Sequence, residues 1–357
     1  MEIKPLIIKD KVAKIPIVQG GMGIGISLHG LAGAVAKEGG VGIISAAQIG
    51  FKEPDFDKDP FTANLRAIKN EYDKARETAP DGVIGFNIMV AMNHYEEYVK
   101  EAAKCGADII VSGAGLPVDL PSYIEGYDTK IAPIVSSVKA ASIVLRYWDR
   151  KYKRTADMVV IESAYAGGHL GFHFDEIEAF DQKTYESEIT KIISLVREYE
   201  VKYNTKIPVV LAGGMTDHND LENAFHLGAD GIQVGTRFVT TKECDADIRY
   251  KEAYIKSKKD DIRIIKSPVG MPGRAIYNEA MRVVERDGKI PIKSCHQCIK
   301  GCKRSEIPYC ITELLIKAAQ GDVDNGLIFC GAKGYKSEHI ETVKDVIDSF
   351  ISGKGCV

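Results

Sequence analysis

The sequence predicts a (β/α)8 barrel of the α/β class, followed by an irregular extension that contains several cysteines. Eight short apolar segments recur along the first 240 residues, and helical patterns lie between them. Most of these segments are apolar along their whole length, as strands buried on both faces of a parallel sheet are. A doubly wound open sheet is the alternative, but its Gly-x-Gly-x-x-Gly turn ahead of a helix is not cleanly placed in this chain.

The expected strands are apolar runs rich in β-branched residues. They are residues Ile15–Gly20, Val41–Ala46, Val83–Val90, Asp108–Ser112, Lys130–Ser136, Asp157–Glu162, Ile207–Ala212 and Gly231–Val234. The helical patterns between them include Leu31–Glu38, Asn64–Glu77, Tyr95–Cys105, Ala140–Tyr152, Tyr185–Glu200 and Asp217–Leu227. The segments CGADII and LGADGI precede the fourth and the eighth strand. Their similarity indicates repeated βα units, in which a glycine ends each helix before the next strand begins.

Beyond residue 240 the regular alternation stops. Residues 241–261 are charged and predict a helix, whereas residues 262–278 are interrupted by glycine and proline and predict a loop. A final helix is expected around Glu338–Ile351. We therefore divide the chain into a barrel, residues 1–240, and an extension, residues 241–357, that packs on it and is too irregular for a core of its own.

Composition and charge exclude several classes of protein. The 357 residues carry a formal net charge of −3, which gives no electrostatic reason to expect nucleic acid or an anionic membrane as partner. A small-molecule substrate is expected instead, and self-association into a homo-oligomer stays open. The chain has no long apolar run, and its N-terminus is interrupted by charge, so neither a membrane span nor a secretory signal is expected. A cytoplasmic location follows.

Glycines follow the ends of two neighbouring predicted strands, where barrels commonly bind phosphate. Ala212-Gly213-Gly214 closes the seventh strand, and Gly235-Thr236 follows the eighth. Backbone amides without side-chain cover can approach an anion closely, and a helix N-terminus adds partial positive charge. Either pair alone could be a tight turn, but the two together on adjacent strands favour a phosphate site.

Another glycine-rich turn, Gly20–Gly25, follows the first strand. By itself it suits a close-packed loop. At the rim of a barrel that binds phosphate, however, such a turn lets a flat ring lie against the backbone, and a flavin fits that geometry.

Two titratable residues follow the sixth strand. His169 comes directly after Gly167-Gly168, on a loop where an imidazole could exchange protons near neutral pH; the alternative is a structural histidine. Glu162 ends the strand and could accept hydrogen bonds from hydroxyl groups of a ligand; the alternative is a salt bridge.

These motifs resemble the nitronate monooxygenase family, formerly called the 2-nitropropane dioxygenases. The resemblance spans about residues 10–240 and is carried by IPIVQGGMGIGIS, GFNIM, IVSSV, IES followed by AGGHLGF, PVVLAGGM and GIQVGTRF. The flavin-dependent enoyl-acyl carrier protein reductases share that fold and those motifs. One departure is Tyr165, which stands where many relatives carry an acidic residue, and this leaves the substrate open.

The resemblance implies a site for FMN with His169 as the active-site residue, acting as base or stabilising an anionic substrate. The residues implied to bind FMN are Gly20, Gly21, Met22, Asn87, Ser137, Glu162, Gly167, Gly168, Ala212, Gly213, Gly214, Gln233, Gly235 and Thr236. The family reaction oxidises alkyl nitronates with O2 to a carbonyl compound and nitrite. The alternatives are an enoyl-thioester reductase that uses FMN and NAD(P)H, and a flavin-binding sensor without turnover.

A cysteine-rich segment, residues 295–310, lies in the extension. Cys295, Cys298, Cys302 and Cys310 follow a C-x2-C-x3-C-x7-C spacing, and C-x2-C is typical of zinc and iron–sulfur ligands. We predict that the four thiolates hold Zn or an Fe–S cluster that ties the extension across the barrel mouth. Packed free thiols and a redox-active pair are the alternatives.

Overall fold

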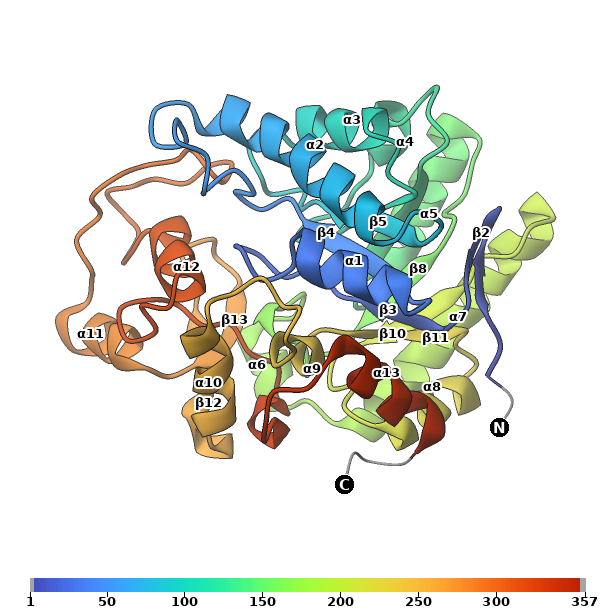
Figure 1. Ribbon diagram of the computed structural model, residues 1–357. Helices are drawn as coiled ribbons and strands as arrows, with labels where there is room; N and C mark the ends of the chain where they lie inside the picture. The colour runs from blue at the N-terminus through green and yellow to red at the C-terminus, as the bar shows by residue number, and fades with distance from the viewer. Residues whose placement is uncertain (1–2, 354–357) are drawn as a thin grey trace.

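A closed barrel of eight parallel strands forms the centre of the computed structural model, which describes residues 3–353 (Figure 1). Around the barrel the strands follow in chain order and β11 closes onto β3. They are β3 (Ile17–Gln19), β4 (Val41–Ser45), β5 (Val83–Asn87), β6 (Ile109–Ser112), β7 (Lys130–Val135), β8 (Val159–Glu162), β10 (Val209–Ala212) and β11 (Gly231–Val234). The predicted (β/α)8 barrel is confirmed, and each strand lies within its predicted segment.

The helices around the barrel begin and end close to the predicted positions. They are α1 (His29–Lys37), α2 (Pro60–Thr78), α3 (Tyr95–Lys104), α5 (Val138–Tyr152), α7 (Gln182–Tyr203) and α8 (His218–His226); the single turn α4 (Leu120–Tyr123) was not predicted. Several starts are fixed by capping side chains. The carboxylate of Asp59 accepts a hydrogen bond from the amide of Thr62 at 3.1 Å, with Pro60 at the first helical position of α2.

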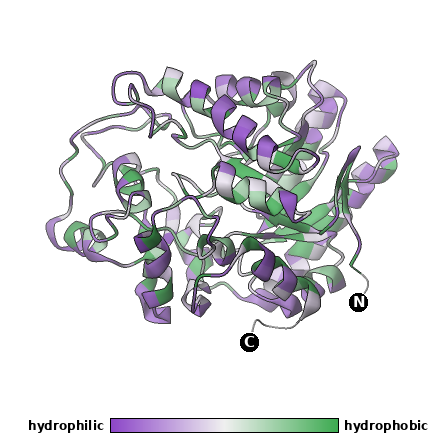
Figure 2. Cartoon of the chain, in the orientation of Figure 1, coloured by the Kyte–Doolittle hydropathy of each residue, from purple (hydrophilic) through white to green (hydrophobic). Residues whose placement is uncertain are grey.

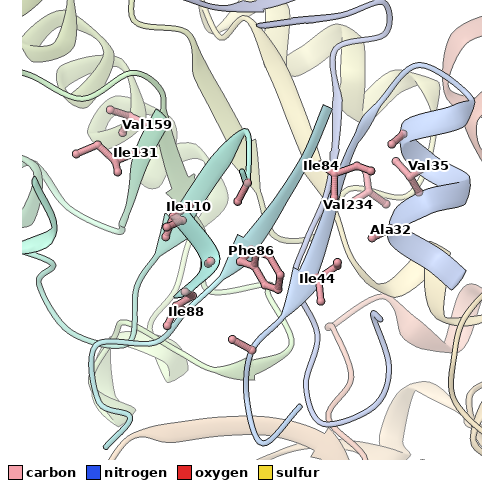
Figure 3. Packing of buried hydrophobic residues seen from close by; sticks show 14 of the residues in the cluster. Ala32, Val35, Ile44, Ile84, Phe86, Ile88, Ile110, Ile131, Val159 and Val234 are labelled. Atoms are coloured by element: carbon pink, nitrogen blue, oxygen red, sulfur yellow. The ribbon is translucent and has the colours of Figure 1, made fainter. Parts of the chain in front are cut away.

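Two apolar layers hold the barrel together. Successive residues of a strand point to opposite faces, so Ile43 belongs to the cluster inside the barrel, whereas Ile44 packs outward. Figure 3 shows the outer layer, in which Ile44, Ile84 and Val35 of α1 lie together. Apolar residues accordingly concentrate in the strands, and polar residues cover the outer faces of the helices (Figure 2).

A hairpin that the sequence analysis did not predict closes the N-terminal end of the barrel. It consists of β1 (Leu6–Ile8) and β2 (Lys11–Ala13). Leu6, Ile8 and Ala13 are buried in the same cluster as the inward residues of the barrel strands. The hairpin therefore plugs one end of the barrel and leaves the other end, at the carboxyl ends of the strands, for the site.

The prediction of a loop over residues 262–278 is wrong. The segment forms β12 (Ile262–Lys266) and β13 (Pro272–Ile276), which pair antiparallel, and β13 also pairs with β9 (Gly168–His169). The glycine and proline that suggested a loop fall at the hairpin turn, where Gly270 has a φ of +82°, and at the start of β13.

The rest of the extension is mostly helical. Its elements are α10 (Ile248–Lys256), α11 (Glu279–Asp287), α12 (Ile311–Ala319), α13 (Val343–Ser352) and two 3-10 turns, η1 (Lys259–Asp261) and η2 (Gly334–Lys336). Two short helices lie earlier: α6 (Phe174–Glu178), between β9 and α7, and α9 (Thr236–Val239), directly after β11. The helix predicted within residues 241–261 is α10, and the final predicted helix is α13.

Helix α13 returns to the barrel, whereas α10, α11 and α12 lie together at one side of it (Figure 1). Val346 and Phe350 of α13 are fully buried in the main apolar cluster, against α1 and α8. The division at residue 240 stays a prediction. Among residues 3–353, no helix has both the length and the apolar character needed to cross a membrane.

The hairpin plug gives a test with a matched control. Ile8 is 1% exposed and its neighbour Ile7 is 51% exposed on the opposite face. We expect Ile8→Ala to lower the free energy of unfolding by about 2–5 kcal/mol, because it leaves a cavity in the plug. Ile7→Ala should change it by about 0.5 kcal/mol or less. Urea unfolding measures both, and equal effects would contradict a plug that is part of the core.

Candidate active site

A cavity of about 240 Å³ opens at the carboxyl ends of the barrel strands. Parallel strands end at the same edge, so the turns that follow them meet there. Almost every residue assigned to the site from the sequence lines this one cavity: Gly20, Gly21, Met22, Asn87, Glu162, Gly167, Gly168, His169, Ala212, Gly213, Gly214, Gln233, Gly235 and Thr236. The barrel thus brings together residues that are spread over more than 200 positions of the chain.

Ser137 is the exception and does not line the cavity. It is the N-cap of α5, and its hydroxyl accepts a hydrogen bond from the amide of Ala140 at 3.2 Å. A serine directly before a helix is a preferred cap, so the position next to β7 serves the start of α5.

At several glycines of the site, neighbouring atoms or the backbone conformation leave no room for a side chain. A Cβ on Gly21 would lie 2.2 Å from Cβ of Asn87, and one on Gly213 would lie 2.5 Å from Oγ of Ser163. Gly213 also has a φ of +93°, a conformation that favours glycine. A Cβ on Gly235 would meet only Met22, at 3.4 Å, and would otherwise project into the cavity. Such a side chain would fill space that a ligand can use.

The side chains of Asn87, Glu162 and Gln233 lie in the cavity wall and make no hydrogen bond to another described residue. Burial raises the pKa of Glu162 to about 7. Its backbone carbonyl accepts a hydrogen bond from the hydroxyl of Tyr185 at 2.9 Å, which fixes the end of β8. Because buried polar groups normally have partners, this wall suits a ligand rich in hydroxyl and amide groups.

His169 is held by the extension. Its backbone pairs with Gly273 of β13, and its Nε2 lies 2.8 Å from Oγ of Ser267. The ring of Phe329 packs edge-on against the imidazole, with 5.1 Å between ring centroids. Burial lowers the pKa of His169 to about 4, so the imidazole is uncharged at neutral pH. It can accept a proton or share a hydrogen bond there.

A buried arginine fixes the loop that carries the histidine. Arg274 of β13 donates hydrogen bonds to the carbonyl oxygens of Ala164 and, at 2.6 Å, Ala166. The loop between β8 and β9 is therefore shaped from outside the barrel, by the sheet that the sequence analysis predicted as a loop.

The extension also supplies cavity residues that the sequence analysis missed. Tyr250, Tyr254, Leu315, Phe329, Cys330, Gly331 and Lys333 all line the cavity. The hydroxyls of Tyr250 and Tyr254 both donate to the carbonyl of Phe329. These residues follow no recognisable motif and lie far along the chain from the barrel turns, so no sequence signal marked them.

The predicted four-thiolate metal site is absent from this structure. Within residues 3–353, no three histidine, cysteine, aspartate or glutamate side chains form a group that could hold a metal ion. Cys295 and Cys302 are exposed, whereas Cys310 is buried at the start of α12. The segment nevertheless contacts the barrel, because Met92, in the loop after β5, bridges to Ile299. The amide of Lys300 also donates to the carbonyl of Ala91 at 2.9 Å, so backbone pairing makes this contact.

Comparison with known families identifies the chain. The model of the family described as nitronate monooxygenase matches residues 4–353. The chain belongs to this family. It is an enzyme, an oxidoreductase of the kind for which the family implies a flavin. A probable nitronate monooxygenase of Staphylococcus aureus (strain Newman) is 25% identical over 311 residues, 77% of this chain and 79% of that protein. One of Staphylococcus saprophyticus is 38% identical over 139 residues, 38% of this chain and 36% of that protein.

Solved structures share the fold. FabK from Thermotoga maritima superposes with a TM-score of 0.69 and 24% identity, covering 94% of this chain and 91% of that one. The nitroalkane oxidase from Streptomyces ansochromogenes gives a TM-score of 0.69 with 18% identity and 94% coverage of each chain. At these identities the likeness establishes the fold.

The cavity carboxyl predicts a pH-dependent stability. Glu162 holds its proton up to about pH 7 when folded but only up to about 4.5 when unfolded, so raising the pH between these values destabilises the fold. Glu162→Gln removes this loss. We expect the variant to gain on the order of 2 kcal/mol over the parent protein between pH 5 and pH 8, measured by unfolding without flavin.

The exposed Glu178 supplies the control for this measurement. Glu178→Gln should show no such gain with pH. A constant difference between Glu162→Gln and the parent protein across the range would mean that Glu162 titrates normally.

Proposed function

We propose that this protein is an FMN-dependent nitronate monooxygenase that oxidises alkyl nitronates with O2 to a carbonyl compound and nitrite. The observation that carries the proposal is the shared cavity of His169 and the bare glycine turns, in a chain whose family match extends over residues 4–353. The probable nitronate monooxygenases of the two staphylococci support the same assignment.

The cavity wall suits FMN at three places. The turns Gly213-Gly214 and Gly235-Thr236 offer backbone amides to the phosphate. Glu162, Asn87 and Gln233 offer unpartnered polar groups to the ribityl chain and the ring edge. The turn from Gly20 to Met22 gives the ring a flat backbone surface. When bound, FMN would supply the transfer of electrons from the substrate to O2.

His169 would act on the substrate in its uncharged form. A neutral imidazole can donate a hydrogen bond from one nitrogen to a nitronate oxygen, or accept a proton from the carbon of the parent nitroalkane. Ser267 at 2.8 Å from Nε2 fixes the plane of the ring, and Phe329 restricts its other face. A cationic imidazole, which an ordinary pKa would allow below pH 6.5, is not available in this pocket at neutral pH.

The cavity also has apolar lining residues, among them Met89, Ile134, Leu315 and Phe329. Such a surface accommodates the hydrocarbon part of an alkyl nitronate, because burial of apolar groups is favourable and needs no specific partner. Cytoplasmic location and homo-oligomer formation stay predictions.

One experiment tests the reaction. The protein is reconstituted with FMN and mixed anaerobically with the nitronate of a nitroalkane, then separately with NADH and NADPH. We expect the nitronate to bleach the flavin absorbance and, once O2 is admitted, to yield nitrite. Bleaching by NAD(P)H with reoxidation by an enoyl thioester would instead establish the reductase, and bleaching by neither would establish a sensor.

His169 has its own test. We expect His169→Ala to leave FMN bound but to slow substrate-dependent flavin reduction by about 10²–10⁴-fold, the usual contribution of acid–base catalysis. His173 is exposed four residues further on, and His173→Ala should reduce the flavin at the parent rate. Stopped-flow absorbance measures both. An unchanged rate in His169→Ala would remove the histidine from the reaction.

A further inference from the structure

The cavity has a positively charged side chain near the glycine turns that we propose to bind phosphate. Among the described residues that line the cavity, Lys333 is the only lysine or arginine. It belongs to the extension and lies just before the 3-10 turn η2. Arg237 is nearby, but its guanidinium donates to the carbonyl of Thr216 and pairs with Glu341 at 2.7 Å, and it does not line the cavity.

Contacts place the segment around Lys333 over the phosphate turns. The amide of Ala332 donates to the carbonyl of Tyr165 at 3.0 Å. A Cβ on Gly331 would lie 2.5 Å from Oγ1 of Thr236, so this glycine allows the segment to touch the turn after β11. The ammonium is thereby anchored next to both glycine turns, although it lies about 100 residues beyond them in the sequence.

Lys333 has a partner that both holds it and offsets its charge. Its Nζ lies 3.0 Å from Oδ1 of Asp220, on α8. The same carboxylate accepts hydrogen bonds from the amide and hydroxyl of Thr216, at 2.7 and 2.9 Å, and Thr216 lines the cavity. The lysine side chain stays 30% exposed, so the ammonium is not closed off by this ion pair. Its Nζ donates to Oδ1 at 3.0 Å and to Oδ2 at 3.2 Å, and it retains one N–H group for a further anion.

We propose that Lys333 binds the terminal phosphate of the flavin, and that it makes this enzyme select a flavin with a phosphate monoester over one without it. The inference rests on the proposed function. A phosphate monoester carries close to two negative charges at neutral pH. The glycine turns offer it backbone amides, and Lys333 adds the single full positive charge at that end. Asp220 moderates the attraction and orients the ammonium.

The test compares two ligands that differ only in the phosphate. Flavin-free protein is titrated with FMN and with riboflavin, and the dissociation constants are taken from the quenching of flavin fluorescence. We expect Lys333→Met to weaken FMN binding by about 10- to 100-fold, the range for a lost hydrogen bond to a charged group. Riboflavin binding should change by less than about twofold, because riboflavin has no phosphate with which Lys333 could interact.

Two further variants complete the test, one expected to strengthen FMN binding and one expected to have no effect. Asp220→Asn keeps an oxygen for Thr216 but removes the charge that offsets Lys333, so FMN should bind several-fold more tightly while riboflavin is unchanged. Lys336 is exposed, lies three residues from Lys333 and does not line the cavity, so Lys336→Met should leave both ligands unaffected.

The results separate this inference from the function it rests on. If the parent protein binds neither flavin, the proposed function fails. If it binds FMN, and Lys333→Met weakens FMN and riboflavin equally or not at all, then Lys333 only ties the extension to α8. If Lys333→Met does not fold, Asp220→Asn decides: an unchanged or lowered preference for FMN over riboflavin overturns the proposal.

Discussion

The closure of the barrel is the constraint on which the rest of the structure depends. Eight parallel strands run in the same direction, so all of their carboxyl ends, and the turns after them, meet at one mouth. The opposite end is plugged by the β1–β2 hairpin, whose apolar residues join the inner cluster. Gly20 and Gly235 are more than 200 residues apart in the sequence, and they share one cavity because β3 and β11 are neighbours in the closed barrel.

The extension fixes the position of the loop that carries His169. Its strand β13 pairs with the two-residue strand β9 and fixes the backbone of His169. Arg274 of the same strand holds the preceding loop through two carbonyl oxygens. Phe329, which bridges to Ala275 of β13, accepts hydrogen bonds from two tyrosine hydroxyls at its carbonyl, and its ring packs against the imidazole. The barrel provides the strand ends, and the extension decides how the loop between β8 and β9 presents its histidine.

The electrostatic character of the cavity comes from its enclosure. Burial raises the pKa of Glu162 to about 7 and lowers that of His169 to about 4, so the carboxyl keeps its proton below about pH 7 and the imidazole is uncharged at neutral pH. The one permanent side-chain cation in the described cavity wall is Lys333, which pairs with Asp220. A ligand with a single anionic end and a polar but uncharged middle matches this distribution.

The sequence by itself determined the barrel and most of its mouth. Apolar runs such as Val41–Ala46 specify buried parallel strands wherever they occur, and Gly213-Gly214 after such a run can only face the mouth of the barrel. The tertiary structure decided three things that no local pattern carries. Ser137 caps α5, residues 262–278 form a hairpin whose strand β13 pairs with β9 across about 100 residues, and the cysteine-rich segment pairs with the loop after β5 through Met92 and Ile299. Long-range pairing and burial depend on partners that a local segment does not contain, which is also why the pKa shifts of Glu162 and His169 follow only from the folded chain.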